Sequence, residues 1–236
     1  MADALQSFNE MTLSSNFQKS LKSKGFEAPT SMQARVIPVA LSNRDLLVST
    51  QPGHGKITTF CIPILAKLEK NVRKAALVLV ADKKSAADVL EFFSQLSPGK
   101  TEMTPTVLVG GSMPTQIKEL AEKPRIIIAT PSRLVEHLRR GSVSLFSIDI
   151  LVINEADKLF DLGAAAQLCE ILRFLPSKRQ TLIFTSSLSP EIQTLASKYL
   201  KDPVRHSEGP AVEKPKKKSL IAKNLAAKSV EVTFQL

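Results

Sequence analysis

Short apolar runs rich in Val, Ile and Leu recur along this chain, and they constrain its fold more than any other feature. Each run has four to eight residues with no polar alternation, which is the pattern of strands covered on both faces. The runs are DLLVST (45–50), AALVLVA (75–81), TPTVLVGG (104–111), RIIIAT (125–130), IDILVINEAD (148–157) and QTLIFTS (180–186).

Amphipathic segments with helical spacing separate these runs. They are TTFCIPILAKLEK, SAADVLEFFSQL, QIKELAEK, SRLVEHLRR, AAAQLCEILRFL and PEIQTLASKYL. An alternation of strand and helix predicts right-handed crossovers and an α/β fold, with a mostly parallel sheet and helices on both faces. In such sheets ligands bind beyond the carboxyl ends of the strands, so we expect the chemistry where each apolar run ends.

Composition narrows the class of protein. Hydrophobic residues make up 43% and charged residues 23% of the 236 residues, as in an ordinary globular protein with a sizeable core. No apolar run approaches the ~18 residues that span a bilayer, and the start, MADALQSFNEM, resembles no secretory signal. Cys61 and Cys169 lack metal-ligand spacing, so we expect packed thiols in a reducing, intracellular compartment.

The net charge of +10 favours a polyanionic partner such as a nucleic acid. Solubility alone is the alternative explanation for this charge. The basic cluster KPKKK (214–218) is interpreted as part of a solvated linker, with a nuclear address or an RNA contact as alternatives.

The periodic pattern weakens after Pro203. We therefore predict one domain over residues 1–206 and a flexible basic linker over 207–229. Residues 230–236, VEVTFQL, have strand composition and are interpreted as the start of a second, absent domain.

A Gly-rich segment, STQPGHGKITTF (49–60), joins the first predicted strand to a helix. Such a loop presents backbone N–H groups and a helix N-terminus to phosphates. Gly53, Gly55 and Lys56 fit a phosphate cradle in this position. His54 could contact phosphate, but an exposed loop histidine is the simpler interpretation.

Three residues depart from an ordinary phosphate loop. Ile57 stands where a Ser or Thr hydroxyl normally coordinates Mg²⁺, and it offers only carbon. Pro52 removes a backbone donor, and Thr50 occupies a place where a smaller residue lets the loop curl tightly.

A second departure follows the fifth run, in LVINEADKLF (151–160). With Asp in place of Asn154 the tetrapeptide would be D-E-A-D, whose first carboxylate holds Mg²⁺ through water. Glu155 would orient or deprotonate the attacking water. Ile57 and Asn154 thus remove two supports of the same ion, so no metal ligand is predicted at either position.

These motifs resemble the N-terminal RecA-like domain of DEAD-box RNA helicases over residues 8 to 206. The segment GFEAPTSMQ (25–33) is similar to the adenine-recognition motif of that family. The resemblance assigns Phe8, Phe26 and Gln33 to nucleotide binding. A phenylalanine ring can stack on a base, and a Gln amide can pair with the adenine edge.

The resemblance also assigns residues to RNA binding and to coupling between sites. The RNA-binding candidates are Lys83, Gly110, Gly111, Thr130 and Arg133. In VADKKSA (80–86) the family pattern P-T-R-E-L-A is altered at Asp82 and Lys84, which puts that RNA contact in question. In TSS (185–187), Thr185 and Ser187 retain the hydroxyls of the family's S-A-T, implying coupling of the nucleotide and RNA sites.

Three functions are consistent with this pattern. The favoured one is an RNA-binding module with weakened or lost ATP hydrolysis, acting in RNA or ribonucleoprotein assembly and binding ATP or ADP weakly with an impaired Mg²⁺ site. The second is an active RNA-dependent ATPase in which Lys56 and Glu155 carry the chemistry. The third is a structural subunit with neither ligand. The resemblance implies that hydrolysis also needs a second RecA-like domain, which we expect to begin at residues 230–236.

Overall fold

The computed structural model describes residues 6–51, 55–96 and 103–208. Within them seven strands form one parallel sheet, in the order β3-β4-β2-β5-β6-β1-β7. The strands are β1 (Leu46–Thr50), β2 (Ala75–Leu79), β3 (Thr106–Leu108), β4 (Ile126–Ala129), β5 (Ile148–Ile153), β6 (Gln180–Thr185) and β7 (Val204–Glu208). Every apolar run contains a strand, which confirms the predicted α/β fold.

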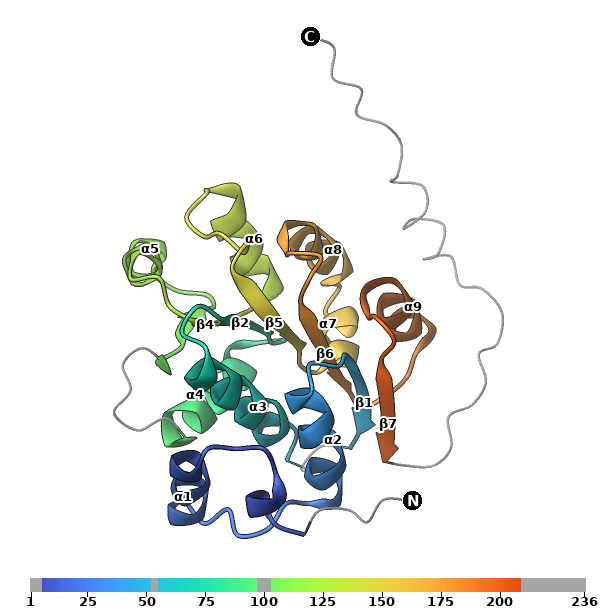
Figure 1. The fold of residues 1–236 in the computed structure, drawn as a ribbon. Coiled ribbons are helices and arrows are strands. Elements are labelled where there is room, and N and C mark those ends of the chain that lie inside the picture. Colours follow the sequence, from blue (N-terminus) through green and yellow to red (C-terminus); the bar gives the residue numbers. More distant parts are fainter. Residues whose placement is uncertain (1–5, 52–54, 97–102, 209–236) are drawn as a thin grey trace.

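Helices cover both faces of the sheet (Figure 1). The first face carries α1 (Ser15–Ser23), α2 (Ser31–Leu41), α3 (Lys56–Lys70) and α4 (Lys83–Leu96). The second carries α5 (Met113–Ala121), α6 (Pro131–Arg139), α7 (Ala156–Asp161), α8 (Ala165–Phe174) and α9 (Pro190–Tyr199). A short 3₁₀ turn, η1 (Phe8–Glu10), precedes α1.

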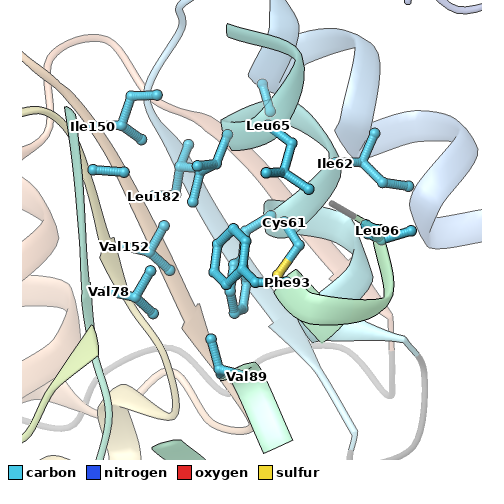
Figure 2. Close-up of a cluster of buried hydrophobic side chains, with 14 of the residues drawn as sticks. Cys61, Ile62, Leu65, Val78, Val89, Phe93, Leu96, Ile150, Val152 and Leu182 are labelled. Carbon is cyan, nitrogen blue, oxygen red and sulfur yellow. The ribbon is translucent and has the colours of Figure 1, made fainter. Parts of the chain in front are cut away.

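Two apolar clusters fill the space between the sheet and its helices. The central strands β1, β2, β5 and β6 are buried on both faces, which explains why their sequences show no alternation. Figure 2 shows part of the first cluster, in which Cys61 and Phe93 lie against Val78 and Val152 of the sheet. Burial raises the pKa of the Cys61 thiol, consistent with a packed, unreactive cysteine.

Strand β7 corrects one predicted boundary. The linker was expected to begin at residue 207, but Ser207 and Glu208 belong to β7, which pairs in parallel with β1 from Leu46 to Thr50. Its sequence, VRHSE, has no apolar run because β7 is an edge strand with partly exposed side chains. The rest of the predicted linker and the segment 230–236 lie outside the described residues.

The described helices also bear on whether the chain could cross a membrane. Within the described ranges, none of the helices combines the length and apolarity that crossing a bilayer requires.

Candidate functional site

The predicted phosphate cradle lies at the carboxyl end of β1, where α3 begins. Lys56 is the first residue of α3, and its Nζ lies 3.5 Å from the carbonyl oxygen of Thr50. The first N–H groups of this 15-residue helix face the same end of the sheet and suit a phosphate. Gly53, Pro52 and His54 lie outside the described residues, so the predicted role of Gly53 is not tested.

Gly55 and Gln33 connect the cradle to the predicted adenine motif. Gly55 adopts a left-handed φ of 74°, and a Cβ built on it would lie 2.6 Å from Gln33 Nε2. The Gln33 amide donates from Nε2 to the Gly55 carbonyl at 3.5 Å. Its Oε1 accepts the Thr30 backbone N–H at 2.9 Å in a capping box at the start of α2. A glycine at position 55 therefore lets the adenine-motif glutamine approach the phosphate loop.

The two predicted aromatic contacts differ in exposure. Phe8 is only 3% exposed and packs in the first apolar cluster, whereas Phe26 is half-buried and packs against that cluster from outside. Phe26 therefore keeps ring surface for a base, while Phe8 supports the region by packing. Base contact remains a prediction for both residues.

The positions expected to hold Mg²⁺ carry no anionic ligand. Ile57 packs its side chain against the first apolar cluster. Asn154 is 3% exposed, and its Oδ1 is buried without a hydrogen-bond partner. Thr50 Oγ1, at the end of β1, is likewise buried and unpaired. Two neutral oxygens and one aliphatic side chain at these positions supply none of the carboxylate ligands that a hard dication prefers. Across the described ranges no cluster of His, Cys, Asp and Glu could hold a metal ion.

Glu155 follows Asn154 in a strained backbone conformation. Its φ and ψ are 54° and 53°, the left-handed region that non-glycine residues seldom adopt. The hydroxyl of Ser85, on α4, donates to Glu155 Oε2 at 2.8 Å. Ser85 therefore restrains the carboxylate that was predicted to act on water.

A second contact joins α7 to the start of α4. Lys158 Nζ lies 2.5 Å from Asp82 Oδ2, and Asp82 Oδ1 accepts the Ser85 backbone N–H at 2.8 Å. The hydrogen bond from Lys158, followed by that from Ser85, lowers the pKa of Asp82 to about 2. The altered residue Asp82 thus has a protein partner, while Lys83 is exposed at the first position of α4.

The predicted coupling residues lie at the end of β6 and contact Asp157. Thr185 Oγ1 lies 3.2 Å from Asp157 Oδ1 and 2.7 Å from the Ser187 carbonyl oxygen, and its single proton can be donated to either acceptor. Ser186, which was not singled out in the sequence, donates its hydroxyl to Asp157 Oδ2. Burial opposes ionisation of Asp157, but these hydrogen bonds outweigh it and hold the pKa of its carboxyl below the usual value. Ser187 contributes its backbone rather than its side chain.

Four of the five predicted RNA-binding residues lie at the carboxyl ends of β3 and β4, whereas Lys83 follows β2. Gly110 and Gly111 are exposed, and Thr130 precedes α6 as its N-cap. Arg133 donates to the Val109 carbonyl at 3.1 Å and to the Gly111 carbonyl at 2.8 Å. Its guanidinium also pairs with Glu136. Arg133 therefore fixes the shape of the glycine loop, in addition to the phosphate contact that was predicted for it.

A buried polar chain, overlooked in the sequence, supports the same loop. Gln116 Nε2 donates to the Val109 carbonyl at 2.8 Å, and Gln116 Oε1 lies 3.0 Å from His137 Nε2. His137 is fully buried, and its Nδ1 lies 2.8 Å from Ser142 Oγ. Because Gln116 Oε1 can only accept, the neutral ring carries its proton on Nε2 and accepts at Nδ1. Desolvation by burial, followed by the charge of Arg133, lowers the pKa of His137.

Sequence spacing could not reveal these supporting residues, because their partners come from other elements. Ser85, Lys158, Ser186, Gln116 and His137 all lie on helices or turns beside a predicted motif. The available signal was a polar residue on an otherwise apolar helix face, as in Gln116 and His137. That signal identifies a buried polar group but not its partner.

Comparison with known proteins agrees with this geometry. A family model described as "DEAD/DEAH box helicase" matches residues 30–195. The chain therefore belongs to the DEAD/DEAH-box helicase family.

Individual relatives cover most of the chain. It is 34% identical over 216 residues to "DEAD-box ATP-dependent RNA helicase 28" of Oryza sativa subsp. japonica, covering 89% of the chain and 27% of the relative. It is 38% identical over 200 residues to "ATP-dependent RNA helicase dbp10" of Emericella nidulans, covering 83% and 21%. A crystal structure of a DEAD box protein from Methanococcus jannaschii matches with a TM-score of 0.81 and 29% identity, over 86% of this chain and 56% of that one.

The chain thus spans 21–27% of the length of some curated relatives and 40–43% of the length of others. DEAD-box helicases use ATP with Mg²⁺ and bind RNA, and the RecA-like fold is shared with the solved structure.

Proposed function

We propose that this chain is an RNA-binding DEAD-box module with weakened or lost ATP hydrolysis, acting in an intracellular RNA or ribonucleoprotein assembly. The proposal rests on the residues at the two expected Mg²⁺ positions, Ile57 and Asn154. The first offers only carbon where a hydroxyl should coordinate Mg²⁺, and the second is a buried, neutral amide with an unpaired oxygen.

The expected loss of ATP hydrolysis follows from the role of Mg²⁺, which neutralises phosphate charge in the transition state. Removing one electrostatic support of a transition state typically lowers the rate by ~10²–10³. Both Ile57 and Asn154 act on the same ion, so their combined effect exceeds that of one substitution. Nucleotide binding would then rest on Lys56, the N-terminus of α3 and the adenine motif around Gln33, and we expect it to be weak.

The RNA face is proposed on separate grounds. Lys83, Gly110, Gly111 and Thr130 lie at the carboxyl edge of the sheet, with Arg133 fixing the glycine loop. The chain is also strongly basic, with a net charge of +10. Exposed glycines allow close approach of a sugar-phosphate backbone, and a lysine adds attraction without base specificity.

An active ATP-dependent RNA helicase is the second candidate. Lys56 and Glu155 are both present at the expected strand ends, and the relatives named above are called ATP-dependent RNA helicases. In that case a second RecA-like domain, following residues 230–236 in the full-length protein, would complete the ATP site.

A phosphate-release assay on the full-length protein, with and without RNA, separates the two candidates. We expect little turnover and no further loss on Lys56→Ala. RNA-stimulated turnover typical of active helicases, abolished by Lys56→Ala, would establish the second candidate instead.

RNA binding is measured in parallel at two ionic strengths. We expect an affinity that falls as salt rises, because phosphate contacts release counterions. Absence of binding even at low salt would leave only a structural role.

A further inference from the structure

A hollow of about 460 Å³ lies at the edge of the sheet opposite the nucleotide cradle. It is bounded by the C-terminal ends of α2 and α3, which lead into the amino ends of β1 and β2. Its polar lining consists of Lys67, Lys70, Lys74, Thr12, Ser42, Asn43 and Asn71. The volume lies within the range of small-molecule sites.

Lys67 forms the buried part of this lining. The residue is only 6% exposed, and its Nζ donates to Gln180 Oε1. The orientation of that amide is fixed because Gln180 Nε2 donates to the Ala40 carbonyl at 2.9 Å and to the Arg44 carbonyl at 2.6 Å. An ammonium has three N–H donors, so Lys67 can offer further donors to a ligand in the hollow.

This lysine is buried without a carboxylate partner. Among the residues that the structure describes, no Asp or Glu lies within ion-pair distance of Lys67. The carboxylates at the same edge, Asp45 and Asp149, accept backbone N–H groups instead. Desolvation by burial, followed by repulsion from Lys74, lowers the pKa of Lys67 to about 7. Buried lysines are rare unless they are paired, so an anion in the hollow would stabilise the charged form of Lys67.

Helix capping does not account for Lys67. Lysines in the last turn of a helix commonly interact with its final carbonyls, but Lys70 reaches the carbonyl of Thr12, outside α3, at 3.4 Å. Lys67 likewise reaches away from its own helix, to a side-chain amide on β6. The interaction of Lys67 is therefore with the sheet and not with the end of α3.

We propose that this hollow binds the phosphate group of a small phosphorylated ligand, with Lys67 as the buried counter-charge and Lys70 and Lys74 at its entrance. A phosphate dianion supplies several acceptor oxygens, which matches a site that carries three lysines and no acid. Ser42, Asn43 and Asn71 line the remaining surface, where polar parts of the ligand can form hydrogen bonds. This proposal is independent of ATP hydrolysis and of RNA binding.

Ligand binding at the proposed site should change the number of protons that Lys67 binds, which can be measured. A bound anion favours the charged form of Lys67, so binding of the phosphate dianion above pH 7 takes up a proton at this residue. The nearby carboxylates Asp45 and Asp149 are engaged by backbone donors, and the other lysines that line the hollow are Lys70 and Lys74. Phosphate itself loses its second proton near neutral pH, so affinity should be highest near pH 7 and should fall as the pH rises further and Lys67 loses its charge.

The test uses inorganic phosphate as the probe in a Lys56→Ala background, which removes the lysine of the nucleotide cradle. Calorimetry in two buffers of different ionisation enthalpy measures affinity and proton uptake together. We expect saturable binding with net proton uptake at pH 8, where phosphate is already mostly the dianion, lost in Lys67→Met and weakened several-fold in Lys70→Gln. Lys118→Gln, which removes an exposed lysine from the last turn of α5, is the matched control and should leave binding unchanged.

Two results would overturn the proposal. One is the absence of phosphate binding at millimolar concentrations, which would leave Lys67 as a neutral, structural amine bound to Gln180. The other is binding that responds equally to Lys118→Gln and Lys70→Gln, which would indicate general charge attraction. Because Lys70 is exposed, its variant remains informative even where Lys67→Met fails to fold.

Discussion

Ser85 Oγ lies 2.8 Å from Glu155 Oε2, so a hydroxyl on α4 restrains the carboxylate that follows β5. Strand β5 has β2 on one side and β6 on the other, and the phosphate cradle at the end of β1 lies beyond β6. Ser85 follows β2, so the hydrogen bond reaches the Glu155 carboxylate from the β2 side of β5. This contact and the adjacent Asp82–Lys158 pair connect the segment that follows β5 to α4. The first residue of α4 is Lys83, which belongs to the predicted RNA face.

Ser85→Ala should destabilise the protein by about 1–2 kcal/mol, because a hydrogen bond to a carboxylate is stronger than one between neutral groups. Ser85→Thr keeps the hydroxyl and should restore most of the loss. Urea unfolding of the three proteins measures the difference. Nucleotide affinity should stay the same in all three, since Ser85 lies on the far side of β5. A variant as stable as the parent would show that the contact contributes nothing.

The sequence predicted the sheet well because its strands are buried on both faces. Apolar runs such as RIIIAT, separated by helical segments, predict parallel strands that are buried on both faces. The carboxyl ends of these strands then bring Lys56, Asn154 and Thr185 to one edge of the sheet. Strand β7 escaped prediction because an edge strand needs no apolar run. The contacts between Ser85 and Glu155, and between Gln116 and His137, join elements far apart in sequence, so no local pattern encodes them.

Asn154→Asp combined with Ile57→Thr should restore a Mg²⁺-dependent gain in ADP affinity of at least about tenfold, equivalent to ~1.4 kcal/mol. The physical reason is that the pair returns one anionic and one hydroxyl ligand to the same ion. Without Mg²⁺, Asn154→Asp alone should lower the Tm, since it places a charge at a position that is 3% exposed. Fluorescent-nucleotide titration with Mg²⁺ or EDTA measures the effect. Equal affinity in both buffers would place the defect elsewhere.

Asp82→Asn should make stability less sensitive to acid. The pKa of Asp82 is lowered to about 2 from an ordinary value of 3.8, so its contribution is fully present above pH 4 and is lost as the pH falls towards 2. The Tm gap between parent and variant should therefore be largest at pH 6 and should narrow by pH 3. Asp161→Asn, at the exposed end of α7, is the control and should show no such gap. A gap that does not depend on pH would mean that the Asp82–Lys158 pair is not the cause.

Gln116→Leu should weaken both stability and RNA binding. It leaves the Val109 carbonyl without its donor and His137 Nε2 without its acceptor, at a cost of about 2–3 kcal/mol. Because Val109 precedes the exposed glycines, we expect a several-fold loss of RNA affinity at a temperature where the variant is folded. Ile117→Ala, at the next position of α5 but partly exposed, is the matched control. Full RNA affinity in a folded Gln116→Leu protein would limit this chain of hydrogen bonds to a structural role.

Lys67→Met should stabilise the protein at pH 7 to 8 in buffer without phosphate, and the gain should disappear by pH 10.5. The pKa of Lys67 is lowered to about 7 in the folded protein from an ordinary value of 10.5, so between these values the unfolded chain binds more protons. The free energy of unfolding of the parent therefore rises with pH between about 7 and 10.5, whereas Lys67→Met lacks this pH dependence. Thermal melts of both proteins from pH 6 to 10.5 measure it, with Lys118→Met as the control for loss of an exposed lysine. Parallel curves for parent and Lys67→Met would mean that the ammonium is already neutralised by a partner.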